Sequence, residues 1–217
     1  QDLDVRIFSD RDINSQKTEV EIALDGADVF FSSLLFDYNQ VVWLRERIAQ
    51  IPIRLVFESA LELMACTKLG TFIIGETNKG IPKPVKFILD KFNNGREEDK
   101  LASYISFLKI GPKLLKFIPI DRVQNLRNWL IIYGYWNAGG IDNVAALFWV
   151  LAEKYLGLEV GDIPPPLETP NMGLIHPDYQ GYFTSPRDYL EWYKVNSVNV
   201  SLSAHIPVVG ILIYRKH

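Results

Sequence analysis

The chain opens with short apolar runs that are separated by helix-like patterns. The runs lie at residues 5–8, 28–32 and 53–57, and they are rich in residues that favour β-strands. Such runs are typical of parallel strands that are buried on both faces. The pattern therefore predicts an α/β fold, with a parallel sheet whose strands are connected by helices.

Helix signals follow the second and third runs. Asp37 and Gln40 have the spacing of a capping box, and Val41 begins an apolar stripe on one helical face. Residues 58–69 contain helix formers, and Gly70 is a natural stop. Because a doubly wound domain ordinarily has a strand and a helix before this point, we expect that one βα unit precedes residue 4 in the complete fold.

The second half of the sequence has a helical pattern. We predict two amphipathic helices within residues 101–120, a helix that starts at Asp121, and a further helix that Asp142 caps. Ser185 and Pro186 start a short helix, and the unalternating apolar run at residues 206–214 predicts a buried strand.

Three parts are expected from this reading. They are an α/β N-terminal domain at residues 1–80, a helical segment with a glycine-aromatic loop and a proline-rich loop at 81–205, and a strand at 206–217 that leads into a following domain.

Composition restricts the class of protein. The chain has 217 residues, is 48% hydrophobic and 23% charged, and carries a net charge of −3, which is typical of a globular protein. A negative net charge gives no basic field for phosphates, so neither nucleic acid nor an anionic membrane surface is an expected partner. The N-terminus has no signal-peptide pattern and no apolar run has the length of a transmembrane segment, so we expect an intracellular protein.

The most unusual segment of the sequence lies at residues 129–140, WLIIYGYWNAGG. Large aromatic side chains stand among three glycines whose backbone is free to reach positive φ, which suits the lining for a flat ligand or a fixed interface. The other interpretation is a hydrophobic cluster at a helix end. The candidate ligand contacts in this run are Tyr133, Tyr135, Trp136, Asn137, Gly139 and Gly140.

Secondary candidates carry carboxylate or imidazole groups. Glu168, His176 and Asp178 lie close together in the sequence, but Mg²⁺ prefers carboxylates and water, so His176 is expected to hydrogen-bond within its HPD turn. Glu58 lies at the carboxyl end of a predicted strand, where open α/β sheets usually bind ligands, as do Ser32, Ser33 and Ser59.

Common catalytic fingerprints are absent from the sequence. There is no GxGxxG, no GxxxxGK[ST], no GxSxG and no HExxH. A nucleotide site therefore has no signature in this chain, and we expect no tightly bound cofactor.

Several segments, in the order WLIIYGYWNAGGIDNV, PPPLETPN, HPD, GYF, SP and YLEWY, resemble the N-terminal region of the large subunits of the magnesium and cobalt chelatase family. The similarity is dense over residues 126–193 and weaker over 27–75. It implies a subunit that binds protoporphyrin IX and Mg²⁺, the latter as a substrate. Two ATPase partner subunits would use the ATP, and a porphyrin-binding activator protein is a further partner that the resemblance allows.

The resemblance also implies a location and a limit. Members act in chlorophyll or bacteriochlorophyll biosynthesis, in the bacterial cytoplasm or the chloroplast stroma. Because the complete large subunit is several times longer, this piece alone is expected to be inactive and its catalytic residues lie elsewhere. Two alternatives stay open, namely a non-catalytic interaction or sensory module of the same fold, and a cobalt chelatase subunit.

Overall fold

The structure is a computed structural model that describes residues 3–74, 110–167 and 173–196. The chain divides into two compact units, Gln1–Pro166 and Leu167–His217. The predicted boundaries at residues 80 and 205 lie outside the described residues, as do the predicted strand at 206–214 and Glu168, so these stay predictions.

The first unit is built around a four-stranded mixed sheet with the order β1-β2-β3-β4. The strands are β1 (Val29–Ser33), β2 (Ile53–Phe57), β3 (Lys68–Leu69) and β4 (Phe72–Ile73). β1 and β2 are parallel with Ser33 opposite Phe57, whereas β2–β3 and β3–β4 are antiparallel. The predicted α/β class is therefore confirmed, with a parallel pair extended by an antiparallel hairpin.

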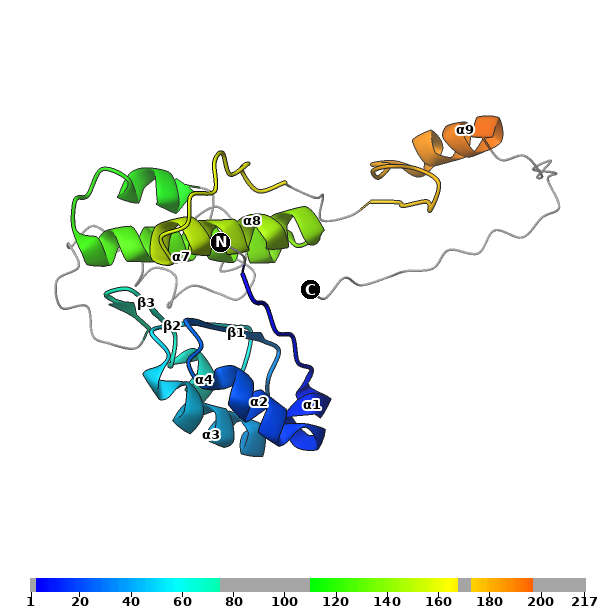
Figure 1. The fold of residues 1–217 in the computed structure, drawn as a ribbon. Coiled ribbons are helices and arrows are strands. Elements are labelled where there is room, and N and C mark those ends of the chain that lie inside the picture. Colours follow the sequence, from blue (N-terminus) through cyan, green and yellow to red (C-terminus); the bar gives the residue numbers. More distant parts are fainter. Residues whose placement is uncertain (1–2, 75–109, 168–172, 197–217) are drawn as a thin grey trace. The chain divides into compact units, whose positions relative to one another are not determined.

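Helices cover both faces of this sheet (Figure 1). One layer contains α1 (Asp10–Ser15), α2 (Lys17–Leu24), α3 (Tyr38–Arg47) and α4 (Leu61–Met64), and a 3-10 turn, η1 (Ile48–Gln50), follows α3. The other contains α7 (Asp121–Ala138) and α8 (Ile141–Tyr155). Because β2 alternates, Leu55 and Phe57 pack towards α7 and α8, while Val56 packs towards α3 and α4.

The predicted helix start at Asp37 is confirmed. The Asp37 carboxylate accepts a hydrogen bond from the Gln40 backbone N–H at 3.0 Å, and Val41, Leu44 and Ile48 are buried on one face. The N-cap and the apolar stripe were both visible in the sequence.

One predicted element of the first unit is wrong, and another is predicted too long. Residues 5–8 form no strand, because Val5 and Ile7 are exposed and the intervening polar residues Asp4 and Arg6 form an exposed ion pair. Residues 58–69 are helical only in α4. Thr67 is fully buried and its hydroxyl accepts a hydrogen bond from the Val56 N–H of β2, which ties the following residues into β3.

The α7–α8 hairpin differs from the prediction at the start of its second helix. α7 continues through Gly134 to Ala138, and the turn consists of Gly139 and Gly140 with φ of 62° and 85°. Both angles favour glycine. Gly140, and not Asp142, is the N-cap of α8; Asp142 lies in the first turn, where a carboxylate complements the helix dipole.

Residues 110–115 are helical, and the rest of the predicted pair at 101–120 lies mostly outside the described residues. In the second unit, α9 (Pro186–Asn196) starts where Ser185 and Pro186 predicted it. The Ser185 hydroxyl accepts a hydrogen bond from the Asp188 N–H at 3.2 Å, as an N-cap does.

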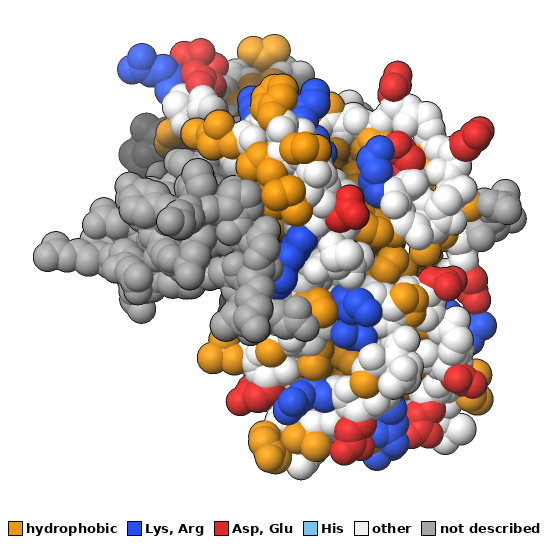
Figure 2. Space-filling view, turned by 90° about the vertical axis from the view of Figure 1, so that its left-hand side faces the viewer, with side chains coloured by type: hydrophobic (Ala, Val, Ile, Leu, Met, Phe, Trp, Pro, Cys, Tyr) orange, Lys and Arg blue, Asp and Glu red, His pale blue; other side chains and the backbone are white. Residues whose placement is uncertain are grey.

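Basic and acidic side chains are interspersed on the face of the molecule that Figure 2 shows. This distribution fits the small net charge of −3. No part of that face, among the described residues, carries an extended field of one sign.

Candidate functional site

Strained backbone marks the carboxyl ends of the two parallel strands. Leu34 follows β1 with φ of 61°, and Glu58 follows β2 with φ of 47°. Among the described residues these are the non-glycine positions with positive φ, and each costs on the order of 1–3 kcal/mol. Such strain clusters at functional sites, and the edge is also where open α/β sheets bind ligands.

Ser59 ties the two strand exits together. Its hydroxyl donates to the Phe57 carbonyl at 2.9 Å and accepts from the Leu35 N–H at 3.1 Å. The Ala60 N–H in turn donates to the Leu35 carbonyl at 2.9 Å. These bonds hold the loops after β1 and β2 rigidly together. We call this place, formed by Leu34, Leu35, Glu58, Ser59 and Ala60, the carboxyl-edge site.

Two buried hydroxyl groups, at the end of β1, directly precede the carboxyl-edge site in the sequence. The side-chain oxygens of Ser32 and Ser33 are buried and have no hydrogen-bond partner among the described residues. Because a buried polar group without a partner costs about 1–3 kcal/mol, a hydrogen bond from a ligand atom to either hydroxyl would be stabilising.

Tyr133 reaches the same edge from α7. Its hydroxyl donates to the Glu58 carboxylate over 3.5 Å. Burial first, and then the negative charge of Glu58, raise the pKa of the Tyr133 phenol well above its usual range. The phenol therefore stays neutral and serves as a hydrogen-bond donor.

An aromatic layer lies between α7 and the sheet. The Tyr133 ring stacks on Trp129 with centroids 5.5 Å apart and meets the edge of Phe57 at 4.8 Å. Trp136 packs against Phe31 at 4.9 Å. The predicted aromatic run thus contributes the rings of Trp129, Tyr133 and Trp136 to the core that supports the carboxyl-edge site.

Tyr135 is buried in the same core, but its hydroxyl group bonds elsewhere. Its hydroxyl donates to the Pro164 carbonyl at 2.5 Å, and burial raises its pKa. Tyr133 and Tyr135 are 8% and 4% exposed, so neither presents an open ring face. The structure therefore does not bring the three aromatic residues onto one surface.

The remaining candidates of the run shape the helix hairpin. Gly139 and Gly140 make the turn, and the buried Asn143 amide donates to the Gly139 carbonyl at 2.7 Å. Asn137 is half-buried at the end of α7. Sequence reasoning missed Trp129, although its spacing of four residues from Tyr133 places both on one helical face.

The second unit holds its own aromatic cluster. Leu174 and Phe183 exchange backbone hydrogen bonds, and Phe183 stacks on Tyr179 at 4.1 Å. The His176 ring lies 4.9 Å from Trp192, and its Nδ1 accepts from the Asp178 N–H at 3.2 Å. His176 therefore hydrogen-bonds within the HPD turn as the sequence predicted, while the Asp178 side chain is exposed.

An open hollow of about 640 Å³ lies at the opposite end of the parallel strands. Its lining includes Glu21, Asp25, Asp28 and Arg47, and Arg47 is already paired with Glu21 at 2.8 Å. Because its charged groups are exposed or paired, we place the candidate site at the carboxyl edge instead.

Metal and membrane features are absent from the described part of the chain. Among the described residues, no three histidine, cysteine or carboxylate side chains lie close enough together to hold a metal ion. No described helix combines the length and the apolarity needed to cross a membrane.

Comparison with known proteins assigns both halves of the chain. Residues 1–130 match a family described as a domain of unknown function, DUF3479, and residues 133–217 match the family described as CobN/Magnesium Chelatase. The magnesium-chelatase H subunit of Chlorobaculum parvum is 32% identical over 219 residues, which cover 100% of this chain. The chain belongs to the DUF3479 family and is a homologue of the magnesium-chelatase H subunit.

Other relatives are also named as magnesium-chelatase H subunits. The chloroplastic ChlH subunit of Oryza sativa subsp. indica is 27% identical over 203 residues, which cover 89% of the chain and 14% of that subunit. The H subunit of Rhodobacter capsulatus is 28% identical over 130 residues, which cover 57% of the chain and 10% of that subunit. The chain spans only 17% of the length of the Chlorobaculum subunit, and it is similar to the N-terminal region.

The two family matches of this chelatase homologue meet inside one helix. The first ends at residue 130 and the second begins at residue 133, whereas α7 runs without a break from Asp121 to Ala138. The boundary between the families is therefore not a boundary between folded units. Leu130 and Tyr133 pack in the same core.

Proposed function

We propose that this chain is the N-terminal part of a magnesium chelatase large subunit that binds protoporphyrin IX for insertion of Mg²⁺. ATP is consumed by two ATPase partner subunits, and Mg²⁺ is the substrate. The observation that carries this proposal is similarity to a magnesium-chelatase H subunit along the whole chain. The product serves chlorophyll or bacteriochlorophyll synthesis, in the cytoplasm of a photosynthetic bacterium or in the chloroplast stroma.

The contribution of this piece is support and orientation rather than the insertion chemistry. Metal insertion needs a base for the pyrrole protons and oxygen ligands for Mg²⁺. The described residues offer one carboxylate beside buried hydroxyls, at the carboxyl-edge site. Glu58 and Tyr133 are our first candidates for a polar contact with the macrocycle, and Trp136 for an apolar one. Tyr135, Asn137, Gly139, Gly140, His176, Asp178 and Glu168 stay secondary proposals.

A second function is favoured by one observation. Tyr133 and Tyr135 are buried, so the aromatic run works as core packing in this conformation. A non-catalytic interaction module that keeps the fold without binding a tetrapyrrole agrees with that burial.

Spectral titration separates the two functions. The full-length subunit that contains this chain is titrated with protoporphyrin IX while the porphyrin absorption band and tryptophan fluorescence are followed. A shifted band with quenching is expected, and Glu58→Gln should weaken binding while Asp142→Asn, an exposed carboxylate elsewhere, leaves it unchanged. A full-length subunit that gives neither signal favours the interaction module.

The metal is assigned by activity. The full-length subunit, mixed with both ATPase subunits, ATP and protoporphyrin IX, should form the Mg²⁺ porphyrin. Formation of a cobalt product from a corrinoid precursor, without the magnesium product, would instead assign a cobalt chelatase.

A further inference from the structure

A group of exposed apolar side chains lies just ahead of α7. Residues 110–120 expose four large apolar side chains, and the two lysines between them are also exposed. We call this surface the lysine-flanked face, and its members are Ile110, Leu114, Phe117, Ile120, Lys113 and Lys116. Exposed large apolar side chains that gather on a protein surface mark interaction sites in soluble proteins.

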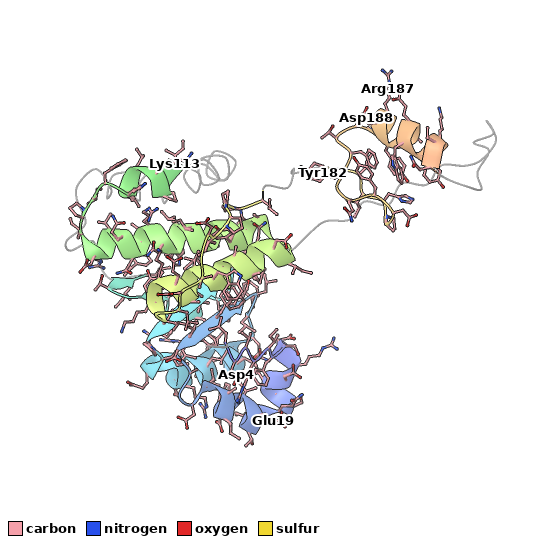
Figure 3. The ribbon with its side chains drawn as sticks, turned by 45° about the horizontal axis from the view of Figure 1, so that its top comes forward. Asp4, Glu19, Lys113, Tyr182, Arg187 and Asp188 are labelled. Atoms are coloured by element: carbon pink, nitrogen blue, oxygen red, sulfur yellow. The ribbon has the colours of Figure 1, made fainter. Side chains whose placement is uncertain are left out.

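Ile110 and Leu114 lie one helical turn apart, and Phe117 lies in the turn that follows the helix. Phe117 is 82% exposed. Figure 3 labels Lys113 on this short helix, where its side chain points away from α7.

The face is held rigidly on the core from below. Leu115 is 2% exposed and belongs to the same core as α7. The Gln124 amide donates to the carbonyls of Leu115 and Ile118, at 2.9 and 2.6 Å. The Arg127 guanidinium donates to the Pro112 carbonyl at 2.9 Å. A surface fixed in this way loses little entropy when a partner binds.

The charge of this face differs from that of the chain. Residues 110–120 contain two lysines and no acidic side chain, although the whole chain carries a net charge of −3. A partner that fits this face therefore combines an apolar pocket for Phe117 with carboxylates at its rim.

We propose that the lysine-flanked face is a docking surface for another subunit of the chelatase, one with an apolar pocket rimmed by carboxylates. The inference rests on the proposed function, because relatives of this chain are named as subunits of a larger enzyme. The protruding phenylalanine enters the pocket, and the lysine ammonium groups pair with the rim.

The test uses the full-length subunit and its ATPase partner subunits. Phe117→Ser and the double variant Lys113→Glu/Lys116→Glu are compared with Ile141→Ser, which changes an 88% exposed residue at the start of α8. Loss of a central apolar contact should weaken partner binding by about tenfold or more, whereas Ile141→Ser should leave it unchanged. The charge-reversed variant should also lose most of the salt dependence of association.

Three results would overturn the proposal. Partner affinities equal to the unchanged subunit for both variants exclude this face. A lowered melting temperature for Phe117→Ser, with no change for Ile141→Ser, shows that the face packs within its own chain. Sedimentation of the unchanged subunit with phosphatidylserine vesicles, lost in Phe117→Ser while subunit binding persists, assigns the face to a lipid surface.

Failure of the inference is distinguishable from failure of the proposed function. Protoporphyrin binding by the unchanged subunit tests the function and does not involve Phe117. If the Phe117→Ser variant binds porphyrin and inserts Mg²⁺ as well as the unchanged subunit at limiting partner concentration, the function is retained and the docking surface is refuted.

Discussion

The Tyr133 hydroxyl of α7 lies 3.5 Å from the Glu58 carboxylate that follows β2, although 75 residues separate them in the sequence. This contact connects the helical layer to the strained end of the parallel strands. It also buries a phenol next to a negative charge, which raises the pKa of Tyr133.

The stability of the fold should therefore fall in alkali. A phenol with a pKa above its unfolded value of about 10 binds its proton more tightly when folded, so its contribution is complete below pH 10 and is lost as the pH rises through the folded pKa. We expect the free energy of unfolding to decrease above pH 10, and Tyr133→Phe to flatten that decrease. Urea unfolding of the unchanged protein and of Tyr133→Phe, at pH 8 and at pH 11, measures this decrease in the free energy of unfolding. An identical pH dependence in the variant would contradict the assignment to Tyr133.

Two glycines should respond oppositely to alanine. At Gly70, φ is 57° and a Cβ would lie 2.7 Å from the Asn125 side chain, which bonds Thr71 and Tyr155. Gly70→Ala should cost about 1–3 kcal/mol. At Gly134, inside α7, a Cβ meets nothing within 4 Å, so Gly134→Ala should stabilise by about 0.5–1 kcal/mol. Thermal unfolding of both variants decides the signs, and a loss at Gly134 would show that the helix needs this glycine.

Gln124 should stabilise the conformation of the lysine-flanked face. Its amide donates two hydrogen bonds to carbonyls, so Gln124→Ala removes about 1–2 kcal/mol of support. Gln124→Glu should cost more, because a carboxylate cannot donate and faces two carbonyl oxygens. Amide hydrogen exchange over residues 115–118 should accelerate in the same order. Equal exchange in all three proteins would mean that Leu115 alone holds the segment.

Phe183 should hold the second unit together. Among the described residues of that unit it is the buried side chain, and its ring contacts Tyr179, Tyr189 and Trp192. Phe183→Ala should abolish the near-ultraviolet circular dichroism of this cluster and shift Trp192 emission to longer wavelength. The neighbouring Tyr182 is exposed, so Tyr182→Ala is the matched control and should change neither signal. A Phe183→Ala spectrum that matches the control would show that the cluster forms without its buried ring.

Local signals in the sequence predicted the elements that depend on local interactions. Asp37 and Gln40 revealed α3, Ser185 and Pro186 revealed α9, and two apolar runs revealed β1 and β2. Thr67 shows why the helix at 58–69 was predicted too long. Its hydroxyl accepts a hydrogen bond from the Val56 N–H of β2, eleven residues earlier in the sequence. This tertiary contact overrides the helix propensity of the segment.

The candidate site could be predicted only in part. Glu58, Ser32 and Ser33 were recognisable because strand ends are readable from apolar runs. That Tyr133 reaches Glu58 while Tyr135 turns to Pro164 depends on the rotation of α7 against the sheet. Tertiary packing determines that rotation, because residues of α7 such as Leu126 and Leu130 share one core with side chains of β2.

The long separation between β2 and α7 affects how the protein emerges from the ribosome. Leu55 and Phe57 are synthesised long before the helix that covers them, because Tyr133 follows Glu58 by 75 residues. During that interval the nascent sheet has an apolar side without its native cover, which is the kind of surface that chaperones protect. Translation pauses between β4 and α7 would prolong this exposure, so nascent-chain solubility should recover only once α7 has left the exit tunnel.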